Sequence, residues 1–306
     1  MTEHGMANVI AVVVTYNRKD LLIKCLSALK NQTHKLKKIL IIDNASTDGT
    51  AELLKNRGII CDDLVDYQRT SINIGGAGGF SVGIKQALNK YQPNWVWLLD
   101  DDVEPTHDCL ERLLADACRD CIIHPTRVDP DGRRVRWHQH FDPLRYRKVF
   151  TNIEFEAVDY LVSTNVACFE GSLISRKVLQ DMPFNLEKFF IHEDDTLYGF
   201  LASTRFPVLY TSSALVKRLL PAPAIVSDWK VYYLIRNIFW LYKTLRAKKI
   251  INGINIFFAA FYASIKAMRI LIPIILKFLV FAASKNRLKA AIRGFIDGLF
   301  DKPFPI

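Results

Sequence analysis

The first 115 residues alternate between unbroken apolar runs and stretches in which apolar side chains recur at helical spacing. "VIAVVVTYN" (9–17) is β-branched and continuous, which is typical of a strand buried on both faces of a parallel sheet. "KKILIIDNAS" (37–46) and "WVWLLDDD" (95–102) are further runs of this kind. The pattern therefore predicts several buried strands.

Helical periodicity separates these runs. Residues 18–32 place apolar side chains on one face of a helix, at Leu22, Cys25, Leu26 and Leu29. Helix-like stretches also occur at 46–58 and 78–91, each before or after a strand. Strand and helix in alternation predict an α/β fold with a doubly wound sheet.

Polar side chains follow each predicted strand, at 15–17, 43–44 and 100–102. Asn and Asp are common turn residues, so each position alone has an ordinary turn explanation. In doubly wound sheets, however, ligands bind where the carboxyl ends of the strands meet. Three strand ends with polar residues therefore favour a single functional site at that edge.

The three consecutive aspartates, Asp100 to Asp102, require a cation, because adjacent buried carboxylates repel one another. In an extended segment Asp100 and Asp102 point to the same side, while Asp101 faces elsewhere. Carboxylate oxygens suit Mg²⁺ or Mn²⁺, which commonly complete their shells with water and substrate phosphates. The pattern predicts a metal that holds a diphosphate.

The glycine-rich segment 71–88 has four glycines ahead of a predicted helix: Gly75, Gly76, Gly78 and Gly79. Such glycines allow close backbone approach to an anion or a sugar hydroxyl. The dinucleotide fingerprint G-x-G-x-x-G should directly follow the first strand, where this chain reads "TYNRKD". A dinucleotide site of that type is therefore not predicted.

Six motifs occur along residues 8–220 in a fixed order: "VVVTYNR", "IIDNASTDGT", "NIGGAGGF", "WVWLLDDD", "FEGSLISRKVL" and "FFIHEDDTLYGFL". This order resembles family two of the glycosyltransferases, which are inverting enzymes with a GT-A fold. "NIGGAGGF" followed by "WVWLLDDD" is most similar to bacterial galactofuranosyltransferases and their rhamnosyltransferase relatives. The resemblance implies a GT-A domain over residues 1–228, with a mixed Rossmann-like sheet flanked by helices.

The resemblance also implies a donor site for a UDP- or dTDP-sugar. Its residues would be Thr15, Asn17, Arg18, Asp43, Asn44, Asn73, Gly75, Gly76 and Asp101. Asp100 and Asp102 would be the D-x-D pair that binds Mn²⁺ or Mg²⁺. Relatives tend to offer a metal-binding histidine downstream, but residues 210–223 contain none. Lys217 or Arg218 would contact phosphate there instead.

In "HEDD" (192–195), the resemblance implies that Asp195 is the general base, with Asp194 as its neighbour. Inverting transfer is a single displacement, which needs a base for the acceptor hydroxyl and a cation for the departing diphosphate. Crowding among Glu193, Asp194 and Asp195 should raise their pKa values. A solvated helix start is the alternative interpretation, since acidic side chains are favourable there.

Acceptor contacts are implied for Glu170 and Gly171, at the rim of the site. Glu170 could equally be a helix cap or an ordinary surface acid. His192 is a further acceptor candidate, although such a histidine is more often a packed aromatic than a ligand. The basic and aromatic stretch 131–148 suits either an acceptor's phosphates or a solvated loop.

Charge is uneven along the chain. The net charge is +10, yet residues 229–306 hold 14 Lys and Arg against 2 Asp and Glu, whereas residues 1–228 hold 27 against 29. The near-neutral larger part argues against nucleic acid as a partner. The six cysteines show neither a disulfide framework nor a complete zinc motif, and residues 1–10 do not resemble a cleaved signal peptide.

Residues 229–306 mix aromatic and aliphatic side chains with Lys and Arg. Their longest uncharged run is 16 residues, 250–265, whereas a spanning helix needs about 20 apolar residues. Such helices lie in the membrane interface, so we expect a peripheral module on an anionic membrane, at the cytoplasmic face of the bacterial plasma membrane. A packed helical domain or a homo-oligomer interface is the alternative.

These expectations combine into one function. The chain is predicted to be a metal-dependent inverting hexosyltransferase that moves galactofuranose from UDP-galactofuranose to a polyprenyl-diphosphate-linked glycan during synthesis of a cell-surface polysaccharide such as lipopolysaccharide. Rhamnosyl transfer from dTDP-rhamnose is the second choice. A non-catalytic protein that binds nucleotide sugars or organises a membrane assembly is the alternative from another class.

Overall fold

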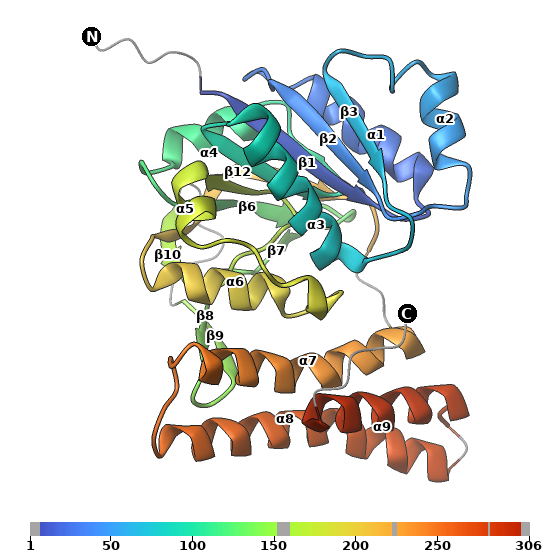
Figure 1. Cartoon of the computed structure of the whole chain (residues 1–306), viewed down its shortest axis with the longest axis vertical. Helices are drawn as coiled ribbons and strands as arrows, with labels where there is room; N and C mark the ends of the chain where they lie inside the picture. The colour runs from blue at the N-terminus through green and yellow to red at the C-terminus, as the bar shows by residue number, and fades with distance from the viewer. Residues whose placement is uncertain (1–6, 152–159, 222–224, 281, 301–306) are drawn as a thin grey trace.

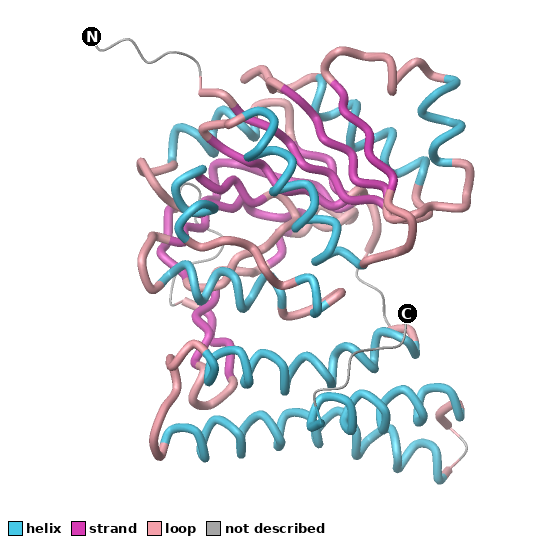
Figure 2. Tube along the Cα trace, in the orientation of Figure 1, coloured by secondary structure: helices cyan, strands magenta, loops and turns pink. Residues whose placement is uncertain are grey.

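The computed structural model describes residues 7–151, 160–221, 225–280 and 282–300 (Figures 1 and 2). Most of the N-terminal stretch considered as a signal peptide (1–6) and the end of the basic tail (301–306) lie outside the described residues. The strands are β1 (Val9–Thr15), β2 (Lys38–Asp43), β3 (Val65–Arg69), β4 (Trp95–Asp100), β5 (Val103–Pro105), β6 (Ile122–Val128), β7 (Arg134–Val135), β8 (Gln139–Asp142), β9 (Arg147–Phe150), β10 (Leu161–Thr164), β11 (Ser172–Ser175) and β12 (Val208–Arg218). The helices are α1 (Lys19–Lys30), α2 (Thr50–Asn56), α3 (Gly75–Gln86), α4 (Cys109–Asp116), α5 (Arg176–Asp181), α6 (Asp194–Ser203), α7 (Asp228–Ala247), α8 (Asn255–Leu279) and α9 (Lys285–Phe300), with a π-helical turn η1 (Ala87–Tyr91) and a 3-10 turn η2 (Glu187–Phe189).

One mixed sheet forms the centre of the molecule, with strand order β10-β12-β6-β11-β4-β1-β2-β3. The strands β4, β1, β2 and β3 run parallel, and β11 joins β4 in the antiparallel sense. The predicted α/β alternation and the mixed Rossmann-like sheet are confirmed. The carboxyl ends of β1, β2 and β4 consequently lie side by side, as the sequence predicted.

Both faces of the sheet are buried, which explains why β1 is apolar without interruption. Alternate side chains of β1 enter two different cores: Ile10, Val12 and Val14 face one, and Val9, Ala11 and Val13 the other. Helix α3 covers the first core closely, because a Cβ at Gly83 would lie 2.3 Å from Val12 Cγ1. The glycines of α3 therefore serve packing as well as the site.

The three C-terminal helices form a layer on the far side of α6 from the sheet (Figure 1). Helix α7 contacts α8, α9 and η2. Its buried residues Val231, Ile235 and Ile238 belong to the same hydrophobic core as α3 and β1. The chain thus enters the C-terminal layer at α7 without leaving the core of the first 228 residues.

Helix α6 lies directly on the chain at residues 166–167. A Cβ at Gly199 would lie 2.1 Å from the Ala167 backbone nitrogen, and backbone in a packed core does not yield readily. We predict that Gly199→Ala lowers the free energy of unfolding by about 1–3 kcal/mol, the usual cost of overpacking. Thermal denaturation followed by circular dichroism measures this.

The matched control is Gly76→Ala, also in a helix, where an added Cβ meets no atom within 4 Å. That change should leave the melting temperature unchanged or raise it, because alanine favours helix. Equal melting temperatures for the two variants would contradict the close contact at Gly199.

Candidate active site

The ends of β1 and β4 are joined through Asp101. Thr15 Oγ1 donates a hydrogen bond to Asp101 Oδ2 over 2.7 Å, and the Tyr16 amide donates to the same oxygen over 3.4 Å. Arg18 Nη1 lies 3.1 Å from Asp101 Oδ1 and 2.6 Å from Asp102 Oδ2. Burial raises the pKa of Asp101 to about 6, although Arg18 and Thr15 oppose the shift. Three predicted donor-site residues, Thr15, Arg18 and Asp101, therefore contact one another.

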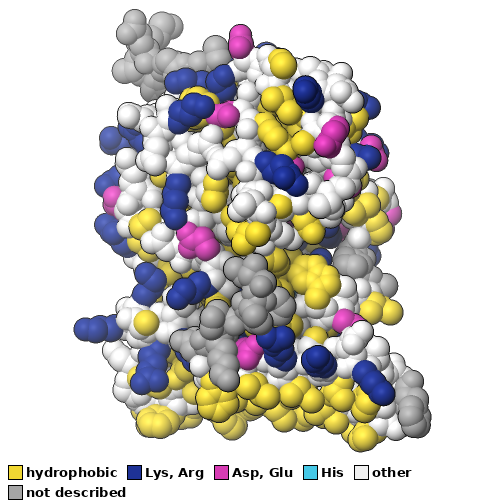
Figure 3. Space-filling view, turned by 45° about the vertical axis from the view of Figure 1, so that its right-hand side comes forward, with side chains coloured by type: hydrophobic (Ala, Val, Ile, Leu, Met, Phe, Trp, Pro, Cys, Tyr) yellow, Lys and Arg dark blue, Asp and Glu magenta, His cyan; other side chains and the backbone are white. Residues whose placement is uncertain are grey.

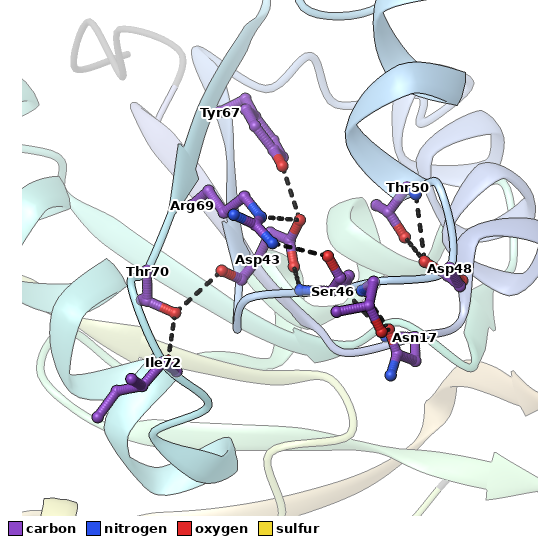
Figure 4. Close-up of polar contacts among 10 residues, drawn as sticks. Asn17, Asp43, Ser46, Asp48, Thr50, Tyr67, Arg69, Thr70 and Ile72 are labelled. Atoms are coloured by element: carbon purple, nitrogen blue, oxygen red, sulfur yellow. Dashed lines mark hydrogen bonds and ion pairs between the residues drawn. The ribbon is translucent and has the colours of Figure 1, made fainter.

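Asp43 ends β2 and is fully buried (Figure 4). Its Oδ1 accepts from the Ser46 amide over 2.8 Å, and its Oδ2 accepts from the Tyr67 hydroxyl over 2.6 Å. Arg69 Nε lies 3.9 Å from Oδ2. Burial and this hydrogen bond raise the pKa of Tyr67. Asp43 thus fixes the turn after β2, while its role in the donor site stays a prediction.

Asn17 joins the loop after β1 to the loop after β2. Its side-chain Oδ1 accepts from the Thr47 backbone amide over 2.7 Å, and its backbone N–H donates to Ser46 Oγ over 2.9 Å (Figure 4). Its φ of 54° lies in the left-handed region, which asparagine tolerates better than most residues. The two loops that border the predicted nucleotide pocket are therefore held as one unit.

The turn at Gly75 connects the donor side to the acidic loop, which we define as residues 188–193. Asn44 Nδ2 donates to the Gly75 carbonyl, and Asn73 Oδ1 accepts from the Gly75 amide, both over 2.9 Å. Gly75 has a φ of +74°, and an added Cβ would lie 2.2 Å from the Phe190 carbonyl oxygen. The Ala77 amide donates to that oxygen over 3.2 Å. Only glycine fits here, so the predicted role of Gly75 in close approach applies first to protein backbone.

Asp100 to Asp102 lie where β4 turns into β5, so strand alternation does not govern Asp102. Burial and the nearby carboxylates of Asp102 and Glu170 raise the pKa of Asp100 well above its ordinary value. A divalent cation would relieve this repulsion, and the oxygen donors of Asp100 and Asp102 suit Mg²⁺ or Mn²⁺. Within the described ranges, however, no three His, Cys, Asp or Glu residues are grouped to hold a metal. The residues fit a cation that takes its remaining ligands from substrate and water.

The acidic loop leads into α6, where Asp194 and Asp195 form the first turn. Burial and the charge of Asp195 raise the pKa of Asp194 to about 7, and burial and Glu193 raise that of Asp195 against the opposing charge of Lys148. For Glu193 the predicted rise is wrong. Lys148 Nζ lies 3.3 Å from its Oε2, and Lys148 and Lys266 outweigh burial and lower its pKa. The solvated helix start does not describe Asp194, which is buried.

The acceptor candidates lie in different surroundings. Glu170 is neither a helix cap nor a free surface acid, because it pairs with Arg127 over 2.8 Å and with Arg218 over 3.4 Å. Gly171 is buried, its backbone amide donates to the Leu98 carbonyl over 2.9 Å, and an added Cβ would lie 2.9 Å from Pro125 Cγ, so close packing favours glycine there. His192 is half-buried, and burial together with Lys230 lowers its pKa to about 4. The acidic loop therefore contains an uncharged imidazole.

Two lysines in the site were not singled out from the sequence. Lys148 belongs to β9, so the stretch 131–148 is not simply a solvated loop, and its Nζ donates to Thr196 Oγ1 over 2.7 Å. Lys230 lies in the first turn of α7, where burial and the charge of Arg18 lower its pKa, and the nearby Asp102 and Asp100 oppose that shift. A lysine is electrostatically unfavourable at a helix N-terminus. Its presence near the start of a predicted helix was the sequence signal that could have marked Lys230 as a site residue.

Comparison with known proteins agrees with this geometry. The family model described as "Glycosyl transferase family 2" matches residues 10–182. The chain is 38% identical over 205 residues to galactofuranosyltransferase GlfT1 of Mycobacterium tuberculosis, covering 61% of this chain and 62% of the relative. It is 36% identical over 97 residues to GlfT1 of Mycolicibacterium smegmatis, covering 32% and 30%. The chain thus spans less than two thirds of each relative.

Solved structures show the same fold. GalNAc-T7 with UDP, GalNAc and Mn²⁺ has a TM-score of 0.62 at 14% identity, covering 77% of this chain and 48% of that one. TarS of S. aureus with UDP-GlcNAc has a TM-score of 0.58 at 16% identity, covering 95% and 81%. The sheet, its flanking helices and the matched family model together place this chain in glycosyl transferase family 2, with a GT-A fold.

Proposed function

We propose that the protein is an inverting glycosyltransferase that uses a nucleotide-activated sugar, with UDP-galactofuranose as the donor. The observation that carries the proposal is the contact between the two halves of the site: the donor-side turn at Gly75 lies against the acidic loop that precedes Asp195. The similarity to GlfT1 supports galactofuranose. Rhamnose from dTDP-rhamnose is the second candidate.

In this mechanism Asp195 accepts the proton of the acceptor hydroxyl while that oxygen attacks the anomeric carbon. The raised pKa of Asp195 and that of Asp194, about 7, make this acidic pair more basic than ordinary carboxylates. Arg18 and Lys230 supply positive charge on the side of the leaving diphosphate. A metal held by Asp100 and Asp102 would neutralise that diphosphate further.

The acceptor we propose is a glycan on a polyprenyl diphosphate, and the apolar side chains that the C-terminal layer exposes support attachment to a membrane. In α8 the side chains that face the protein are mostly small, namely Ala259, Ala263, Ala267, Leu271 and Ile274. The side chains that face outward include Phe257, Phe258, Phe261, Leu276 and Leu279, each more than half exposed. A helix of a soluble protein shows the reverse arrangement.

Figure 3 shows a band of hydrophobic side chains at the level of α8 and α9, with Lys and Arg side chains directly above it. By length and composition alone α8 could also cross a membrane, which the count of uncharged residues had argued against. We favour a helix lying in the interface of the inner leaflet of a bacterial plasma membrane, because Lys266 on its protein side contacts the Tyr146 ring over 4.6 Å. Basic residues of α9 such as Lys289 and Arg293 suit anionic lipid.

The first test is transfer from UDP-galactofuranose to a polyprenyl-diphosphate-linked glycan with Mn²⁺. Asp195→Asn should lower kcat by about 10²–10⁴-fold, the usual contribution of a general base, and leave UDP affinity unchanged.

Asp102→Ala should weaken UDP binding in calorimetry with Mn²⁺, and EDTA should weaken binding to the wild type. UDP binding without transfer by the wild type would favour the non-catalytic alternative.

The pH dependence tests the base more closely. Lys148→Met removes the positive charge that opposes the raised pKa of Asp195, so that pKa should rise further. Because the base must be ionised, the acid limb of kcat/KM should move to higher pH, by about one unit for a charge this close. The control Lys177→Met, which breaks the exposed pair with Asp181, should leave the profile in place. An unchanged acid limb in Lys148→Met would exclude Asp195 as the titrating group.

Membrane attachment is tested by flotation with phosphatidylglycerol vesicles. Replacement of Phe257 and Phe261 by serine should abolish flotation, since both side chains are exposed and their burial in lipid drives binding. Leu161→Ser, at an exposed apolar position in β10, is the control and should float as the wild type does. Absence of flotation by the wild type would favour a packed domain or oligomer interface for this layer, and retained flotation of the double variant would exclude Phe257 and Phe261 as the attachment site.

A further inference from the structure

The side chain of Asn237, in α7, binds backbone carbonyls of the acidic loop. Its Nδ2 lies 3.0 Å from the Phe189 carbonyl oxygen, 2.6 Å from that of Ile191 and 2.9 Å from that of His192. An amide nitrogen carries two hydrogens, so at least one hydrogen is shared between two carbonyls. One fully buried side chain therefore provides the hydrogen bonds for three backbone carbonyls of the loop.

Arg236 binds the same loop from the preceding position. Its Nη2 donates to the Lys188 carbonyl over 2.7 Å and to the Phe189 carbonyl over 2.9 Å. It also donates to Asn237 Oδ1 through Nε and Nη2, over 2.9 and 2.8 Å. That contact fixes the Asn237 amide with its nitrogen toward the loop. The guanidinium lies 4.0 Å from the ring centre of Trp240, and Arg236 as a whole is 2% exposed.

The loop needs such support because its backbone is strained. Phe190, His192 and Glu193 have φ values of 65°, 69° and 67°, a region that residues with a side chain adopt only when their surroundings impose it. Glu193 is the residue directly before α6, and Asp194 and Asp195 follow. The direction of the first turn of α6 therefore depends on this strained segment.

The loop is held from the opposite side by α3. The Phe190 carbonyl accepts from the Ala77 amide over 3.2 Å, and the Phe190 ring stacks on Tyr233 of α7 with 4.8 Å between ring centres. The acidic loop thus lies between the donor-side turn and α7. Each of its carbonyls from Lys188 to His192 accepts a hydrogen bond from one of these two elements.

We propose that Arg236 and Asn237 are positioning residues for the reaction: they hold the acidic loop in its strained form and so place Asp195 relative to the donor sugar. This inference rests on the proposed role of Asp195. It also assigns α7 to the catalytic unit, although the helix belongs by charge and sequence to the C-terminal layer. Burying an arginine and an asparagine costs desolvation free energy. Apolar side chains could fill these positions without that cost, so packing alone does not explain the two polar residues.

The test is Asn237→Leu in the full-length protein, a change of similar volume that removes both donors. We expect kcat to fall about 10²-fold, as for a reacting group displaced by about 1 Å, while the dissociation constant for UDP stays that of the wild type. Arg236→Lys should also lower kcat, because an ammonium does not reproduce the planar fork that contacts two carbonyls and the Asn237 oxygen. It serves as the second variant if Asn237→Leu does not fold.

The pH profile separates positioning from a loss of stability. Burial and Glu193 raise the pKa of Asp195, and Lys148 from β9 opposes them, with Lys266 of α8 and Lys230 of α7 also near the loop. A loosened loop exposes Asp195 to water, so the acid limb should move to lower pH. The control Leu245→Ala, at a buried position eight residues along α7, should lower the melting temperature without moving the acid limb.

Hydrogen exchange of the backbone amides in residues 187–196 provides a readout that does not depend on the substrate. It should accelerate in Asn237→Leu and stay unchanged in Leu245→Ala. If the wild type transfers no sugar, the proposed function fails. Hydrogen exchange alone then decides whether Arg236 and Asn237 hold the acidic loop in its strained form. The inference would be overturned if Asn237→Leu kept the exchange rates and the kcat of the wild type. It would also be overturned if Leu245→Ala lost as much kcat as Asn237→Leu.

Discussion

The carbonyl oxygen of Phe190 occupies the space that a side chain at Gly75 would need, and this contact constrains the whole site. It brings a backbone oxygen of the acidic loop within 3.2 Å of the Ala77 amide at the start of α3. Because α3 is itself packed onto β1 through glycine, the acidic loop takes its position from the central sheet. The loop must then adopt left-handed backbone at Phe190 and its neighbours, and α7 supplies the donors that stabilise this conformation.

A second constraint is charge. Asp100, Asp101, Asp102 and Glu170 crowd together at the edge of the sheet, and burial makes their repulsion strong. The cations that balance them come from distant parts of the chain, with Arg18 from the loop after β1 and Lys230 from α7 among them. The diphosphate of the proposed donor would add further negative charge beside these carboxylates, which is why the proposed mechanism includes a divalent metal in addition to the fixed cations.

The fold was predictable because its signals are local. Unbroken β-branched runs such as 9–15 occur where both sheet faces are covered, and the polar residues at their ends do lie at one edge of the sheet. The order of the motifs predicted the donor-site residues, whose role stays a prediction. The rest depends on tertiary contact: nothing near Glu170 in sequence indicates its pairs with Arg127 and Arg218. Likewise, crowding predicted a raised pKa for Glu193, but Lys148 comes from a hairpin 45 residues earlier and reverses the sign.

The C-terminal layer differs from the first 228 residues in charge and composition, but the two parts of the chain share packing contacts. Its basic character sets it apart from residue 229 onward, yet α7 shares a hydrophobic core with α3 and supplies Arg236 to the acidic loop. Meanwhile α8 packs its alanines inward and exposes phenylalanines, while its Lys266 lowers the pKa of Glu193. One helical layer therefore offers apolar side chains outward and stabilises the acidic loop inward. A lipid-linked acceptor lying along α8 would consequently approach Asp195 from the same layer that holds Asp195 in place.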